Sequence, residues 1–147
     1  MISRIYDGPE KFSFTYRERS SDGREGRLKG CLMYVRLIFE FLDQDLMLTI
    51  SRMFDEKNGL DDWLKETFSN TTCIDESDSL IGRFRELDGL GMIDLRVLPG
   101  VGKERFAEII WQRANGWLHE QGLFPRITIK TVEVQENQRV GALYLQG

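Results

Sequence analysis

The chain has 147 residues, of which 41% are hydrophobic and 30% charged, proportions typical of a globular protein with a packed core. Its formal net charge is −4 and no stretch is strongly basic, which argues against nucleic acid as a direct ligand. No apolar run approaches the roughly 20 residues of a membrane span, and no secretory signal is evident at the start. Two distant cysteines and a single histidine exclude most histidine-based metal sites within one chain. We therefore expect one cytoplasmic domain over residues 1–147, with no membrane segment.

A long strand dominates the first part of the chain. Residues 2–6 and 11–16 are expected to be extended, and they are followed by a loop at about 17–26. Residues 27–41 then alternate between apolar and other side chains, which predicts a single half-buried strand. Residues 2–41 therefore predict an antiparallel hairpin. The apolar positions of the long strand are Cys31, Met33, Val35, Leu37, Phe39 and Phe41.

The middle of the chain is predicted to be mainly helical. Residues 46–53 are ambiguous between the end of a strand and the start of a helix. Apolar side chains at helical spacing predict helices over residues 60–68, about 80–87 and 103–121, the last ended by Gly122. Residues 94–98 are compatible with a short extended segment.

A second hairpin closes the chain, with strands over residues 126–136 and 140–145. Val132 and Val134 have the opposite parity to Ile127 and Ile129, which predicts a bulge near Lys130 and Thr131. The fold class is therefore α+β, with a four-stranded antiparallel sheet and helices packed on one face. The other face, which carries Leu32 and Ile38, is expected to be covered by another subunit.

Several segments resemble the family of 6-pyruvoyl-tetrahydropterin and 6-carboxy-tetrahydropterin synthases, and their order along the chain agrees with that family. The segments are TFSNT (67–71) with IDESD (74–78), LRVLP (95–99) with ERFAE (104–108), and VEVQEN (132–137) with ALY (142–144). The resemblance implies the tunnelling fold, in which sheets of several subunits join into an oligomeric barrel. It therefore predicts that the chain forms a homo-oligomer.

The same resemblance implies a catalytic zinc ion held by three histidines. In this chain Tyr16 stands at the first of those positions, and Lys29 and Cys31 stand at the other two. Zinc requires imidazole, thiolate or carboxylate ligands, so these three residues do not make an ordinary zinc site. We therefore expect a divergent member of the family that has lost its zinc and uses no cofactor.

The groups that the family uses for proton transfer are also replaced. The resemblance implies a cysteine base in the first hairpin loop, where this chain has Glu25, and an Asp-His pair where it has Ser69 and Asn70. Serine and asparagine do not titrate near neutral pH, so we expect no catalytic residues. Glu136 matches the glutamate that anchors the pterin ring, and Glu104 matches a glutamate at the start of the last helix. Both are therefore candidate ligand-binding residues.

Simpler explanations stand beside these candidates. For Glu136 we favour a solvated turn carboxylate over a ligand contact, and for Glu104 we favour a first-turn helix residue stabilised by the helix dipole. Cys31 and Cys73 are compatible with small buried hydrophobic residues. His119, near the end of the last predicted helix, is not expected to bind a metal.

Three functional hypotheses follow from the sequence. The first is a catalytically inactive protein that acts as an oligomeric scaffold or interaction subunit. Its partners would be further copies of itself, an active paralogue or another protein, such as a component of a defence or viral assembly. The second is a module that binds a pterin, purine or deazapurine through Glu136. The third is an active lyase of the same family with a rebuilt metal site.

Overall fold

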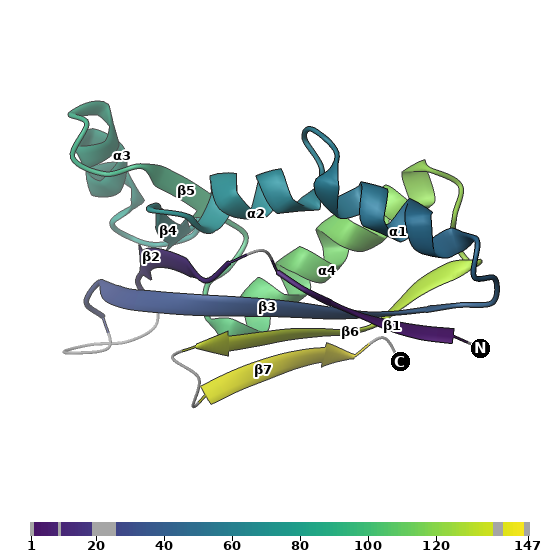
Figure 1. The fold of residues 1–147 in the computed structure, drawn as a ribbon. Coiled ribbons are helices and arrows are strands. Elements are labelled where there is room, and N and C mark those ends of the chain that lie inside the picture. The colour runs from purple at the N-terminus through teal and green to yellow at the C-terminus, as the bar shows by residue number, and fades with distance from the viewer. Residues whose placement is uncertain (1, 9, 19–25, 137–139, 146–147) are drawn as a thin grey trace.

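The computed structural model describes residues 2–8, 10–18, 26–136 and 140–145. They form one mixed sheet with helices on one face (Figure 1). The strands are β1 (Ile2–Asp7), β2 (Phe12–Tyr16), β3 (Lys29–Phe41), β4 (Thr72–Asp75), β5 (Leu95–Leu98), β6 (Ile127–Glu136) and β7 (Val140–Leu145). The helices are α1 (Leu46–Asp55), α2 (Leu60–Phe68), α3 (Ile81–Gly89) and α4 (Lys103–Glu120).

The long strand β3 lies at the centre of the sheet. Strands β1 and β2 pair antiparallel with successive parts of one edge of β3, and β6 pairs antiparallel with its other edge. Strand β7 continues the sheet beyond β6, whereas β4 and β5 extend it beyond β2 as parallel neighbours. The order is therefore β5-β4-β2-β3-β6-β7, with β1 beside the second half of β3.

The alternation predicted for β3 is confirmed. Its six odd-numbered apolar side chains from Cys31 to Phe41 are all buried, while the residues between them face the other side of the sheet and are at least partly exposed. Figure 1 shows α1, α2 and α4 on one side of the sheet, with α3 at the end where β4 and β5 lie. The core therefore lies between the odd-residue face of β3 and these helices.

The predicted bulge is also confirmed. On β3, Ile38 pairs with Thr131 and the next residue, Phe39, pairs with Ile129, so that Lys130 is the extra residue on β6. The insertion lets Ile129 and Val132 both point into the core despite their opposite parity, because a bulge shifts the side-chain alternation by one residue.

The last helix has the expected start, face and end. Its apolar stripe is buried, and Gly122 directly after it has a positive φ of 68°. The amide of Gly122 donates to the carbonyl of His119 (3.1 Å), and the amide of Leu123 donates to that of Leu118 (2.9 Å). These two bonds form a Schellman motif, which explains why glycine stands at this position.

The structure corrects the expected sheet: the described residues form seven strands instead of four, with parallel as well as antiparallel pairs. Strand β4 was missed because it has only four residues, of which the first three are buried, so it shows no alternation. The ambiguous segment at residues 46–53 is the helix α1. The predicted helices and the extended segment at residues 94–98 are confirmed.

The face of the sheet opposite α1, α2 and α4 keeps apolar side chains at its surface. Leu32 on β3 is 39% exposed and Ile5 on β1 is 56% exposed. Within the described part of the chain, no helix is long and apolar enough to span a membrane.

The bulge gives a test of the register. Deleting Lys130 is expected to turn Val132 and Val134 toward the helix-free face, because one residue fewer reverses the parity that follows. We expect the free energy of unfolding to fall by about 3 kcal/mol or more, the value of two buried valines. Chemical denaturation measures this loss. The control is Lys130→Ala, which removes an exposed side chain and keeps the insertion; equal stability of the two variants would contradict the assigned register.

Candidate functional site

The three positions at which the resemblance places metal ligands lie together on the helix-facing side of the sheet. Tyr16 on β2 is the direct cross-strand partner of Lys29 on β3. Cys31 follows two residues later on β3 and therefore points to the same side. The structure thus brings Tyr16, Lys29 and Cys31 together at the end of the β2–β3 ladder.

Two of these three side chains are part of the packed core. Tyr16 is 3% exposed and Cys31 is 5% exposed. The Tyr16 ring meets the Phe106 ring of α4 edge-to-face, with the ring centroids 5.4 Å apart. Burial raises the pKa of the Tyr16 hydroxyl, and burial together with the nearby Glu136 raises the pKa of the Cys31 thiol to about 12. Both groups are therefore neutral at physiological pH.

Glu136 reaches the same cluster from β6. It pairs with Met33 across the β3–β6 ladder, one position of the same parity beyond Cys31. After burial, the charge and hydrogen bonding of its carboxylate are the main causes that raise the pKa of the Cys31 thiol, and its charge also contributes to the raised pKa of Tyr16. Glu136 is half-buried, so it is neither a fully solvated turn residue nor a core residue.

Lys29 carries the positive charge at the edge of the cluster. Its Nζ lies 3.3 Å from Oε1 of Glu18 and 6.0 Å from the centre of the Tyr16 ring. The ion pair is partly exposed, so it contributes little to stability by itself. A second lysine, Lys103 at the start of α4, lowers the pKa of Cys31 slightly against the larger effect of burial.

The donor set around these positions does not fit zinc. A neutral phenol and a lysine are not ordinary zinc ligands, which leaves one thiol with one neighbouring carboxylate. Among the described residues, no three His, Cys, Asp or Glu side chains are grouped so that they could hold a metal ion. No catalytic step through a zinc ion follows from this arrangement.

Glu104 lies beside the cluster, in a hollow at the start of α4. It is exposed and lines a depression of about 450 Å³ together with Glu18, Asp75 and Arg105. Its carboxylate contributes, as a minor cause, to the raised pKa of Tyr16. The structure thus brings Glu104 near Tyr16 but leaves it on the surface.

Ser69 and Asn70 lie elsewhere. Asn70 has a positive φ of 58°, and its amide donates to the carbonyl of Ser13 on β2 (2.7 Å). It lines a second hollow, of about 350 Å³, with Ser13 and Thr15, which alternate with the buried residues of β2 and so face the other side of the sheet. Within one chain, Asn70 therefore lines a hollow on the side of β2 opposite to Tyr16, whereas Ser69 is the residue directly after α2. Glu25 lies outside the described residues.

A buried ion pair beside the site was not predicted. Nη1 of Arg17 lies 2.6 Å from Oδ1 of Asp78, whose side chain is fully buried. Oδ1 of Asp78 also accepts the amide of Leu80 (2.9 Å), and Nε of Arg17 donates to the carbonyl of Gly26 (2.6 Å). Arg17 thus joins the two ends of the first hairpin loop to the segment after β4. The segment IDESD was noted for its resemblance, but its partner lies 61 residues away, which no local pattern reveals.

Neither a family model nor a curated protein matches the sequence. Solved structures do resemble the fold over its whole length. An uncharacterized protein from Wolinella succinogenes is 14% identical with a TM-score of 0.66, covering 100% of both chains. The 6-pyruvoyl tetrahydropterin synthase of Plasmodium falciparum is 13% identical with a TM-score of 0.62, covering 99% of this chain and 97% of the other.

A third similar structure is the Plasmodium vivax synthase with a catalytic glutamate replaced by alanine. It is 12% identical, has a TM-score of 0.58 and covers 99% of this chain and 97% of the other. At this identity the likeness concerns the fold alone. The chain therefore has the tunnelling fold of 6-pyruvoyl tetrahydropterin synthases, as the sequence motifs indicated.

The Arg17–Asp78 pair gives a second test. Arg17→Ala is expected to lower the free energy of unfolding by about 3 kcal/mol, because it leaves the Asp78 carboxylate buried without its counter-charge. Thermal or chemical denaturation measures the change. The matched control is Arg83→Ala, which removes the exposed 4.0 Å contact with Glu86 and should change little. Similar losses of unfolding free energy in the two variants would show that the buried Arg17–Asp78 pair stabilises the fold no more than an exposed ion pair does.

Proposed function

We propose that this chain is a catalytically inactive protein with the tunnelling fold that acts as an oligomeric scaffold or interaction subunit. The observation that carries the proposal is the packing of Tyr16. Its ring is buried against Phe106 at the position where the resemblance places a metal ligand. A metal-dependent enzyme needs an open coordination position for water or substrate, and a packed aromatic ring does not provide one.

The remaining groups support the same proposal. The Cys31 thiol has a pKa of about 12, so it supplies no thiolate for use as a nucleophile or ligand near neutral pH. Ser69 and Asn70 stand where an acid–base pair is implied, and neither side chain titrates in that range. The chain therefore keeps the framework of the fold without the chemical groups that the family reaction requires.

Oligomer formation is supported by the helix-free face of the sheet. Leu32 and Ile5 are exposed there, and the outer strands β5 and β7 each pair with only one neighbour among the described strands. An exposed apolar sheet face with open strand edges favours association with another copy of the same surface. We propose a homo-oligomer formed through this face and these edges.

The third prediction concerns this surface. At micromolar concentration we expect an oligomer by light scattering after gel filtration, and we expect Leu32→Glu to shift the mass toward the monomer, since it places a charge on the apolar face. The control is Leu48→Glu on α1, where the side chain is 78% exposed on the helix layer, and it should keep the oligomer. A monomeric wild-type chain would contradict the scaffold proposal.

Catalytic inactivity is tested separately. The family resemblance implies a dihydroneopterin triphosphate-like substrate, and we expect no turnover of it by the purified protein in the presence of added zinc. Zinc-dependent turnover would overturn the proposal and favour the active-lyase alternative. That alternative rests on the family resemblance alone.

A binding module is the second candidate, and the position of Glu136 favours it. The carboxylate is half-buried beside the neutral Tyr16 and Cys31. Hydrogen bonds to a ligand are stronger in such a place because fewer water molecules compete for the carboxylate. A carboxylate accepts the paired N–H groups of a pterin or guanine edge. Glu104 lines the neighbouring hollow and is proposed as a further contact.

The fourth prediction decides on this candidate by calorimetry with a pterin, guanine and a deazapurine. If the chain binds one of them, Glu136→Gln should weaken binding by roughly tenfold or more, because the amide presents one donor group to the ligand N–H groups. The control is Glu133→Gln, on the same strand but on the other face of the sheet, which should leave the affinity unchanged. No heat with any of the three compounds would remove this candidate.

A further inference from the structure

The disagreement between the metal position and its residues is the feature that carries a further inference. Tyr16 and Lys29 are directly opposed across two strands, and Cys31 lies diagonally from Tyr16 on the same side. Directly opposed Cβ atoms in such a ladder are about 5 Å apart and diagonal ones about 7–8 Å apart. Three side chains at these positions can therefore converge on one point.

In this chain the convergence point is filled by protein groups. The Tyr16 ring has the edge-to-face contact with Phe106, a centroid distance of 6.2 Å to Phe14 and the Lys29 ammonium 6.0 Å from its centre. Cys31 is 5% exposed and lies close enough to Glu136 for the carboxylate to raise the pKa of the thiol. Tyr16 and Cys31 therefore do more than replace metal ligands, because both side chains are packed against other protein groups.

The cluster also contains a positive charge, which belongs to a lysine side chain. Lys29 lies at one of the three positions, and its Nζ is 3.3 Å from Glu18. A divalent cation at the convergence point would meet this ammonium at short range, and like charges in a partly buried site repel strongly. Lys29 thus holds a positive charge at the rim of these positions, where it would oppose the binding of a metal ion.

We propose that a metal-free polar cluster of Tyr16, Lys29, Cys31 and Glu136 takes the place of the metal centre in this chain, with Lys29 as its permanent cation. The inference rests on the part of the proposed function that assigns Tyr16, Lys29 and Cys31 to the metal positions. It adds that the backbone still has the geometry of a metal site and that the exclusion of metal depends on Lys29.

The fifth prediction concerns a variant in which histidines replace the residues at the three positions. The triple variant Tyr16→His, Lys29→His, Cys31→His is expected to bind about one zinc or cobalt ion per chain, since three histidines leave the fourth position open. Elemental analysis after dialysis gives the stoichiometry, and the visible spectrum of the cobalt form reports tetrahedral coordination. The wild-type chain should retain no zinc, and a chelator should leave its melting temperature unchanged.

The matched control keeps the lysine. The double variant Tyr16→His, Cys31→His has two histidines beside Lys29, and we expect it to bind metal at least tenfold more weakly than the triple variant. Equal affinity of the two would show that Lys29 does not exclude the metal. A folded triple variant without metal binding would overturn the assigned geometry, and a wild-type chain with about one tightly held zinc would overturn the whole inference.

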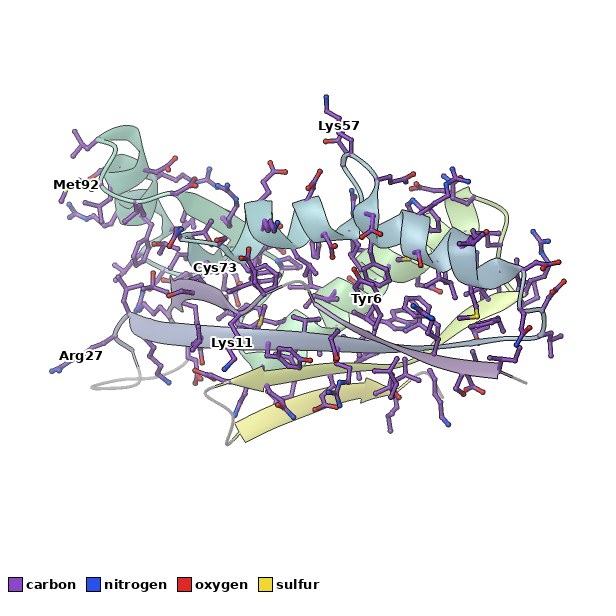
Figure 2. The ribbon with its side chains drawn as sticks, in the orientation of Figure 1. Tyr6, Lys11, Arg27, Lys57, Cys73 and Met92 are labelled. Atoms are coloured by element: carbon purple, nitrogen blue, oxygen red, sulfur yellow. The ribbon has the colours of Figure 1, made fainter. Side chains whose placement is uncertain are left out.

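A second measurement applies if the triple variant does not fold. Lys29→Met keeps the length of the side chain but removes its charge, and we expect it to lower the melting temperature by about 2 °C or more through loss of the contacts with Tyr16 and Glu18. The control is Lys57→Met in the turn between α1 and α2, where Figure 2 shows the lysine projecting away from the molecule. Equal melting temperatures of these two variants would leave Lys29 without a role in the cluster and overturn the inference.

Neither result depends on the oligomeric state. A metal-free monomer would contradict the scaffold proposal and leave the cluster intact, whereas an oligomer that retains zinc would contradict the cluster and leave the scaffold proposal standing.

Discussion

The burial of one face of β3 is the constraint on which the rest of the structure depends. Six apolar side chains along the strand need a continuous cover, and α1, α2 and α4 provide it. Each neighbouring strand must then match the parity of β3. Strand β6 can do so over its whole length only through the extra residue Lys130, because Ile129 and Val132 would otherwise point to opposite faces. The bulge therefore follows from the packing of β3.

The same constraint decides the chemistry of the candidate site. Tyr16 and Cys31 stand at parities that face the helices, so their side chains must be compatible with a dry environment. A phenol and a thiol satisfy this requirement in their neutral forms, and desolvation raises both pKa values accordingly. The charged members, Lys29, Glu18 and Glu104, stand at the rim where water remains. The pattern of neutral centre and charged rim is thus a consequence of where the strands bury their residues.

How much the sequence predicts depends on the range of the interaction. The alternation of β3, the parity change at Lys130 and the stripe of α4 are local patterns, and each correctly predicted its element. Strand β4 has four residues and no alternation, so only its parallel pairing with β2 and β5 defines it. The Arg17–Asp78 pair likewise depends on two loops that meet only in the folded chain.

At the candidate site, too, local sequence patterns and long-range contacts differ in what they reveal. The resemblance assigned Tyr16, Lys29 and Cys31 to the three ligand positions, and this assignment stays a prediction. The cross-strand register shows that the three residues share one face. The sequence did not reveal that Glu136 lies close enough to Cys31 to raise the pKa of its thiol, because this proximity depends on the β3–β6 register. It also did not reveal that Asn70 lines a hollow on the side of β2 opposite to Tyr16. Local motifs nominated the candidate residues, whereas their spatial grouping depends on the topology of the sheet.

Sequence identities of 12–14% with structures of the same fold show how little of the sequence the framework requires. A fold alone does not specify an activity, which depends on the groups at the site. A metal site built on two strands stabilises the fold only when the ion is bound, and it leaves polar ligands in an otherwise apolar layer when it is not. An aromatic ring that packs on Phe106 and a lysine paired at the rim stabilise the same corner of the sheet without an ion. At these positions of the sheet, residues of this kind are therefore physically compatible with a stable fold that holds no ion.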